Sequence, residues 1–136
     1  MRGKGSTNLR DLLRRMSPRL AVGEYVFGTL PSDQIPRGLA PLCTFQESEG
    51  TSLICRRVAA DQCGLRHDGL YRLITLAVDS SLATVGFLAA VSAELAEAGI
   101  VCNAVSAFHH DHLFVPSRDA ARALALLKAL SKRGDP

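Results

Sequence analysis

The densest group of side chains able to do chemistry is the run His109-His110-Asp111-His112. Three imidazoles and a carboxylate could bind zinc or nickel, and a carboxylate beside a histidine could form an acid–base pair. Adjacent residues of a strand point to opposite faces, so we expect His109 and Asp111 on one side and His110 and His112 on the other. One site could then recruit two of these side chains easily, and the sequence holds no second cluster that would complete a metal site. We therefore expect no bound metal and no cofactor.

The alternative interpretation of this run is structural. Asp111 would make an Asx-type turn in a hairpin, and the histidines would bond to the backbone or to the other half of the chain.

A second polar group, Asp79-Ser80-Ser81, interrupts a long apolar stretch over residues 73–99. Residues 73–78 before it alternate with the period of a strand, and residues 88–98 after it follow the period of a helix. We expect Ser80 or Ser81 to cap this helix and Gly99 to end it. A strand that enters a helix through a capped polar loop directs backbone N–H groups at one spot, which suits a carboxylate or phosphate. Ordinary packing with an ordinary cap is the alternative.

Composition places the chain among globular proteins. Its 136 residues are 47% hydrophobic and 21% charged, enough for one compact domain or two very small ones that share a core. No apolar run is long enough to cross a membrane, and the first 19 residues lack the apolar region of a signal peptide. We expect a cytoplasmic protein with no membrane partner.

The positive charge is concentrated at the start of the chain. The first 19 residues hold six basic residues against one acidic residue, while the net charge of the whole chain is +3. Such an arm could contact nucleic acid or an acidic partner, but solvated, frayed tails of this kind are more common, and we expect no nucleic-acid binding. The four cysteines, Cys43, Cys55, Cys63 and Cys102, form no C-x-x-C pair, so we expect buried free thiols.

The remaining elements follow from periodicity and from turn residues. Asn8 should cap a helix over residues 9–16 that Pro18 ends, and residues 24–30 read as a strand. Residues 42–46 and 51–56 predict a hairpin, followed by a helix over 58–63 that Gly64 ends. Further strands are expected over 100–107 and 112–115, and then a last helix capped by Ser117 and ended by Gly134.

These elements predict an α+β fold in which helices cover one face of antiparallel sheets. The second half reads β–α–β–β–α, which lacks one strand of the ferredoxin-like βαββαβ unit, and the first half is an incomplete unit of the same kind. Either two small sheets exchange strands or one sheet continues across a dimer. We expect a basic arm with a short helix over residues 1–19, a first half over 20–68 and a second half over 69–136.

Four stretches carry a resemblance to a known family. They are Gly23-Glu24-Tyr25-Val26-Phe27, the run over residues 44–50, the loop Asp79-Ser80-Ser81-Leu82 with Val85-Gly86, and the run over residues 108–116. Over about residues 9–131 the chain resembles small bacterial proteins built from two ACT-like halves. Those are related to the tandem ACT regions of aspartokinases and to arginine-sensing ACT proteins. The resemblance implies a regulatory protein without catalytic machinery.

The resemblance also implies where a ligand would bind. ACT modules commonly hold amino acids or other small molecules at an interface between two units, using the loop after the first strand and the start of the following helix. Here those positions, with the hairpin that would face the ligand in the first half, are Asp79, Ser80, Ser81, Leu82, Thr84, Val85, Gly86, Thr44, Glu49, Gly50, Thr51 and Ser52.

The sequence contains no G-x-S-x-G, P-loop, H-E-x-x-H or dinucleotide motif, so we expect no enzyme. The prediction is a non-catalytic sensor that binds a small ligand, an amino acid, between ACT-like units. We expect a homodimer that an unidentified effector protein recognises. The alternative is a protein-interaction module without a small-molecule ligand.

Overall fold

The computed structural model describes residues 8–31, 34–79 and 81–136, which form two compact units. The first, which we call the terminal unit, contains both ends of the chain, up to Ala21 and from Leu73 onward. The second, the inserted unit, comprises Val22–Arg72. We expected boundaries after residues 19 and 68 and a separate N-terminal arm. The described part of that arm instead packs into the terminal unit, because its apolar residues complete that unit's core.

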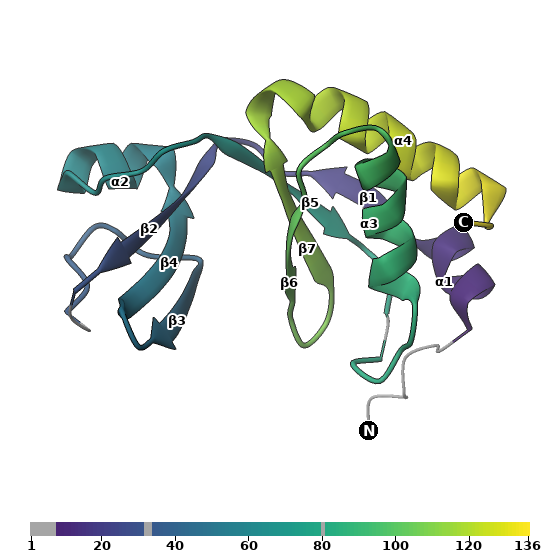
Figure 1. Ribbon diagram of the computed structural model, residues 1–136, viewed down its shortest axis with the longest axis horizontal. Helices are drawn as coiled ribbons and strands as arrows, with labels where there is room; N and C mark the ends of the chain where they lie inside the picture. Colours follow the sequence, from purple (N-terminus) through teal and green to yellow (C-terminus); the bar gives the residue numbers. More distant parts are fainter. Residues whose placement is uncertain (1–7, 32–33, 80) are drawn as a thin grey trace. The chain divides into compact units, whose positions relative to one another are not determined.

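The terminal unit is a four-stranded sheet with helices on one face. Its strands lie in the order β1 (Pro18–Leu20), β5 (Tyr71–Leu76), β7 (Asp111–Pro116) and β6 (Asn103–Ser106). Its helices are α1 (Leu9–Arg15), α3 (Phe87–Glu97) and α4 (Ala120–Arg133), and Figure 1 shows them gathered on one side of these strands. This is the ferredoxin-like strand order, and β1 supplies the strand that the second half lacks.

Strand β1 was not foreseen from the sequence, in which Pro18 was expected only to end a helix. β1 pairs antiparallel with β5 in the register Pro18↔Leu76 and Leu20↔Ile74. A proline is tolerated here because it is the first residue of a short strand, where a missing N–H costs little. The strand that the second half lacks is therefore supplied from elsewhere in the same chain.

The core of the terminal unit explains why its helices lie where they do. Asn8 caps α1, its side-chain oxygen accepting from the Asp11 amide at 2.9 Å, as predicted. On α4, the Ser131 hydroxyl donates to the Met16 carbonyl at 2.9 Å and so holds the end of α1. Apolar side chains from all three helices and from the sheet meet in one cluster, which includes Leu12, Leu13, Ile74, Leu76, Val91, Leu95, Leu113, Val115, Leu127 and Leu130.

The inserted unit is a three-stranded antiparallel sheet with one helix. Its strands lie in the order β3 (Cys43–Glu47), β4 (Gly50–Arg56) and β2 (Tyr25–Leu30), and α2 (Arg57–Cys63) follows β4. The predicted hairpin and helix are confirmed, and Gly64 ends α2 in the left-handed conformation with φ 70°. Gly50 is required in the hairpin, because a Cβ there would lie 2.2 Å from the Leu30 carbonyl oxygen. The small core contains Val26, Leu39, Leu53, Cys55 and Ala60.

Two sequence-based boundaries were wrong in the terminal unit. Strand β6 begins at Asn103 instead of residue 100, because the Ile100 amide donates to the Leu95 carbonyl and its side chain packs in the core. The last helix is not capped by Ser117, since a 3-10 turn, Ser117–Asp119, precedes α4. Gly99 and Gly134 do follow α3 and α4 in the left-handed conformation, as predicted.

Leu13→Ala tests whether α1 is part of the terminal core. Because Leu13 is fully buried, we expect its truncation to lower the free energy of unfolding by about 2–5 kcal/mol. Arg10→Ala on the same helix is the control, since Arg10 forms only an exposed ion pair with Asp135 and its loss should cost less than about 1 kcal/mol. Urea denaturation of the full chain measures both. Equal effects of the two substitutions would show that α1 is not a core element.

Candidate functional site

The loop that leaves strand β5 is the centre of the predicted site. The Ala77 amide donates to the Ser17 carbonyl at 3.1 Å, which fixes the point at which the loop begins. Asp79 follows and is exposed. Ser81 closes a turn, its hydroxyl accepting from the Ala83 amide at 3.1 Å and its carbonyl from the Thr84 amide at 3.0 Å. The expectation that Ser81 caps the helix is therefore wrong, because the helix starts six residues later; Ser80 lies outside the described residues.

The cap residue of α3 is a glycine, which makes no side-chain cap bond. Gly86 occupies the cap position with φ 90°, a conformation that L-residues rarely adopt. The first amide bonded within the helix is that of Ala90, which donates to the Gly86 carbonyl at 2.9 Å. The cap residue, a glycine, has no side chain that could accept from the first-turn amides, so this end of the helix suits an anion.

The histidine-rich run forms the turn between β6 and β7. The Ala107 amide donates to the His110 carbonyl at 3.0 Å, which places His109 at the tip. The Ser106 hydroxyl donates to the Asp111 carboxylate at 2.6 Å. Asp111 therefore bonds across the hairpin to the residue opposite it in register, and not within an Asx turn as we expected.

Two of the histidines attach this hairpin to β5. His110 Nδ1 lies 3.1 Å from the Val78 carbonyl oxygen. Because a carbonyl can only accept, this nitrogen carries the proton, and Nε2 of neutral His110 is left as an acceptor. His112 Nδ1 lies 2.9 Å from the Thr75 hydroxyl oxygen. The ring centroids of His110 and His112 are 6.5 Å apart, and those of His109 and His110 are 6.3 Å apart.

These bonds place the hairpin turn beside the start of the loop, and Figure 1 shows both at the same end of the terminal unit. Exposed apolar side chains gather on the two segments. Leu82 and Val85 in the loop are 68% and 87% exposed, and Phe108 in the turn is 72% exposed. Apolar side chains as exposed as these often mark a surface that another molecule covers.

Burial lowers the pKa of His112 below its ordinary value of 6.5; the neighbouring His110 adds to this effect and Asp111 opposes it. His112 is therefore neutral near pH 7. Among the described residues no group of three or more His, Cys, Asp or Glu side chains could hold a metal ion.

The predicted hairpin residues lie in the inserted unit, and most of their polar groups bond to one another. The Thr51 hydroxyl donates to the Gln46 side chain at 3.0 Å, and the Ser52 hydroxyl donates to the Glu47 carboxylate. The Ser48 hydroxyl donates to Glu49 and, together with a backbone bond, lowers the pKa of that carboxyl. Thr44 is exposed, and Gly50 begins β4 directly after the turn. These bonds account for the hairpin's polar composition without a ligand.

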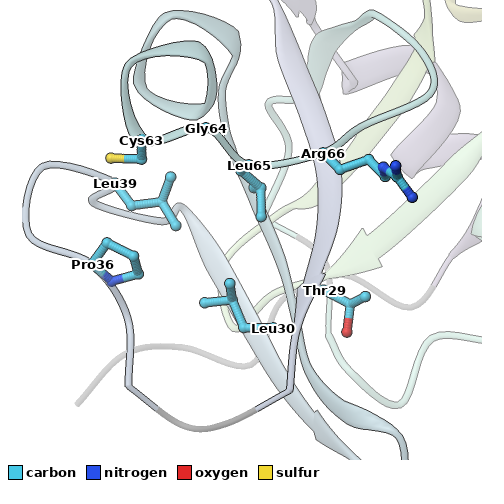
Figure 2. A pocket seen from close by; sticks show the side chains of 8 residues that line it. All are labelled: Thr29, Leu30, Pro36, Leu39, Cys63, Gly64, Leu65 and Arg66. Atoms are coloured by element: carbon cyan, nitrogen blue, oxygen red, sulfur yellow. The ribbon is translucent and has the colours of Figure 1, made fainter.

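The inserted unit also contains two pockets that no motif indicated. One, of about 230 Å³, is shown in Figure 2 and is lined by Thr29, Leu30, Pro36, Leu39, Cys63, Gly64, Leu65 and Arg66. The other, of about 470 Å³, is lined by Tyr25, Gly38, Leu39, Ala40, Pro41, Leu42, Arg56 and Ala59. Residues 36–41, in the loop between β2 and β3, form one wall of both pockets.

The four cysteines are free, as expected. Cys55 is buried, and the other three are partly buried. Burial raises the pKa of the Cys55 and Cys102 thiols, which makes them less reactive.

Comparison with known families finds two matches along the chain. A model of the ACT domain matches residues 4–72, and a second ACT domain model matches residues 70–129. A comparison with curated proteins finds no significant match. Within the described residues, none of the helices has the length and apolar character needed to cross a bilayer.

Solved structures show the same fold. A protein of unknown function from Vibrio cholerae, described as a possible transport protein, is 39% identical with a TM-score of 0.80, covering 90% of this chain and 95% of that one. A protein from Agrobacterium tumefaciens is 24% identical with a TM-score of 0.73, covering 86% and 90%. The regulatory subunit of aspartate kinase from Thermus thermophilus is 12% identical with a TM-score of 0.64, covering 87% and 97%.

His112→Gln tests the burial of this imidazole. Since its pKa is lowered in the folded state, the unfolded chain binds more protons as the pH falls below 6.5, and the folded state loses stability toward its own lower pKa. We expect the melting temperature of the wild type to fall more between about pH 7.5 and about pH 5 than that of His112→Gln. His109→Gln, at the exposed tip of the turn, controls for replacing an imidazole. Identical pH profiles for wild type and His112→Gln would contradict the interpretation.

Proposed function

The chain belongs to the ACT domain family, and from this premise we propose that it is a non-catalytic sensor that binds an amino acid at the loop between β5 and α3. ACT domains are typically regulatory, ligand-binding modules. The likeness to the regulatory subunit of aspartate kinase supports a regulatory role for this chain as well. The proposal retains the expectation that a facing ACT unit completes the site.

The observation that carries the proposal is the N-terminus of α3, whose cap residue is a glycine without a capping side chain. A ligand carboxylate there would accept from the amides of the first turn and would interact favourably with the positive end of the helix. The exposed carboxylate of Asp79 lies in the same loop and can pair with an ammonium group. His110, bonded to Val78 in this loop, offers a further acceptor at Nε2. The loop and the helix start that follows it could thus bind both the carboxylate and the ammonium group of an amino acid.

A sensing role fits this arrangement better than catalysis. Two of the imidazoles are bonded to Val78 and Thr75, and the Asp111 carboxylate is bonded to Ser106. The histidines and the aspartate that could have formed an acid–base pair are therefore engaged in hydrogen bonds that hold the hairpin in place. A bound ligand would act by stabilising one arrangement of the protein over others, and an effector protein would recognise that arrangement. We further propose that the protein acts in the cytoplasm, since free cysteines suit a reducing compartment. We also propose that it forms a homodimer.

A second candidate function, a protein-interaction module without a ligand, is favoured by the exposed apolar residues of the same surface. Leu82, Val85 and Phe108 would pack against a partner chain directly. The two functions differ in whether a free amino acid stabilises the protein.

Thermal melting against the twenty amino acids tests the proposal. A ligand present at one hundred times its dissociation constant adds about 2.7 kcal/mol, which moves the melting temperature of a chain of this size by several degrees. We expect a selective shift that Asp79→Ala abolishes and Ser81→Ala weakens, because Asp79 pairs with the ammonium and Ser81 shapes the turn.

Asp68→Ala is the matched control, since it removes an exposed aspartate from the inserted unit. A shift of equal size in Asp79→Ala and Asp68→Ala would contradict the proposed site. A flat profile across all amino acids would favour the interaction module.

A further inference from the structure

The two units share an order of elements but differ at one place. In the terminal unit, β5 is followed by helix α3 and then by β6, β7 and α4. In the inserted unit, β2 is followed by a loop where a helix would stand, and then by β3, β4 and α2. Leu39 in this loop is 1% exposed and packs in the small core beside Ala60 of α2. Leu39 of this loop fills the core position that a helix side chain would otherwise occupy. The loop nevertheless leaves a space next to α2.

That space is the pocket of about 470 Å³, a volume typical of small-molecule sites. The aliphatic side chains of Leu39, Pro41, Leu42 and Ala59 line it, together with Tyr25 and Arg56. The wall contains strained backbone, because Ala40 has φ 41°, which is rare for a residue with a Cβ. Such strain is often retained where a loop must present a particular surface to a ligand.

Arg56 is the charged group of this pocket, and it is held in place from two sides. Its guanidinium carbon lies 5.4 Å from the centroid of the Tyr25 ring, and Nη1 donates to the Val22 carbonyl at 3.3 Å. Within the part of the chain that the structure describes, no carboxylate forms an ion pair with Arg56, in contrast to Arg57, which pairs with Glu24 and Asp61. The guanidinium can therefore still bind an anion.

We propose that this pocket binds a small apolar monocarboxylate. Arg56 would bind the carboxylate, and the aliphatic wall would accept a short branched or aromatic body. Among the described residues that line the pocket none is acidic, so an α-ammonium group would have no partner on them. The pocket therefore selects a carboxylic acid over the amino acid with the same carbon skeleton. This preference is the reverse of the one proposed for the loop that contains Asp79, which would favour the amino acid. The inference does not depend on the function proposed above.

The smaller pocket does not share this chemistry. Figure 2 shows Leu39, Leu65 and Leu30 around its space, while the Arg66 side chain extends away from them. Arg66 thus provides a control that carries the same charge in the same unit but lies outside the proposed site.

Titration with 4-methylpentanoate, followed in the amide NMR spectrum of the full chain, tests the inference. Leucine, which adds an ammonium group, and 4-methylpentanamide, which lacks the charge, are the matched probes. We expect shifts at Leu39, Ala40 and Ala59, and binding of the carboxylate at least about tenfold tighter than of either matched probe. Arg56→Gln should weaken carboxylate binding by about tenfold or more, while Arg66→Gln should change it less than about twofold.

Ala59→Phe fills the pocket without removing a charge, and it should also abolish binding. This second variant shows whether the loss in Arg56→Gln comes from the pocket or from a general effect of that substitution on folding. Asp79→Ala should bind the carboxylate like the wild type, which separates this site from the amino-acid site. The inference is overturned if 4-methylpentanoate causes no shifts at these residues, if leucine binds equally well, or if Arg66→Gln weakens binding as much as Arg56→Gln.

Discussion

The pairing of β1 with β5 is the constraint on which the terminal unit depends. Three residues near the start of the chain lie antiparallel to Ile74–Leu76, and the Ala21 amide donates to the Leu73 carbonyl at 2.9 Å. This pairing satisfies backbone groups of β5 that would otherwise be an open edge, and it brings α1 onto the core shared with α3 and α4. It also makes residues 22–72 an insertion between two neighbouring strands of one sheet. ACT domain models match the consecutive stretches 4–72 and 70–129, whereas the terminal unit of the structure combines residues from both ends of the sequence.

The position of β5 in turn defines the loop that follows it. The Ser17 carbonyl holds Ala77 on one side, and His110 bonds to Val78 from the β6–β7 hairpin. The loop thus starts from two fixed residues and ends at a helix without a side-chain cap. In the inserted unit a loop takes the place of the corresponding helix, and that unit offers a pocket with an arginine instead of a helix N-terminus. We infer that two related units carry two different binding chemistries, one suited to a zwitterion and the other to an anion with an apolar body.

Local patterns predicted most elements of this fold, and long-range contacts account for what they missed. The hairpin, α2, and the glycines that end α2, α3 and α4 follow from residues that are neighbours in sequence. Strand β1 could not be read locally, because three residues beginning with Pro18 become a strand only when β5 lies beside them. The cap of α3 was misplaced because Ser81 bonds within its own turn and Gly86 supplies the φ that the helix start requires. The pocket at Arg56 left no sequence signal, since its wall is an irregular loop packed on a helix.

The most direct test of the account is the amide NMR spectrum of the full chain titrated with the amino acid that stabilises it most. The central claim is that a ligand carboxylate binds at the glycine-capped start of α3. The account predicts the largest shifts at Phe87, Leu88 and Ala89, with further shifts at Asp79 and His110, and few changes at Leu39 or Ala59. Shifts confined to the inserted unit, or an unchanged spectrum at saturating concentrations of each amino acid, would contradict it.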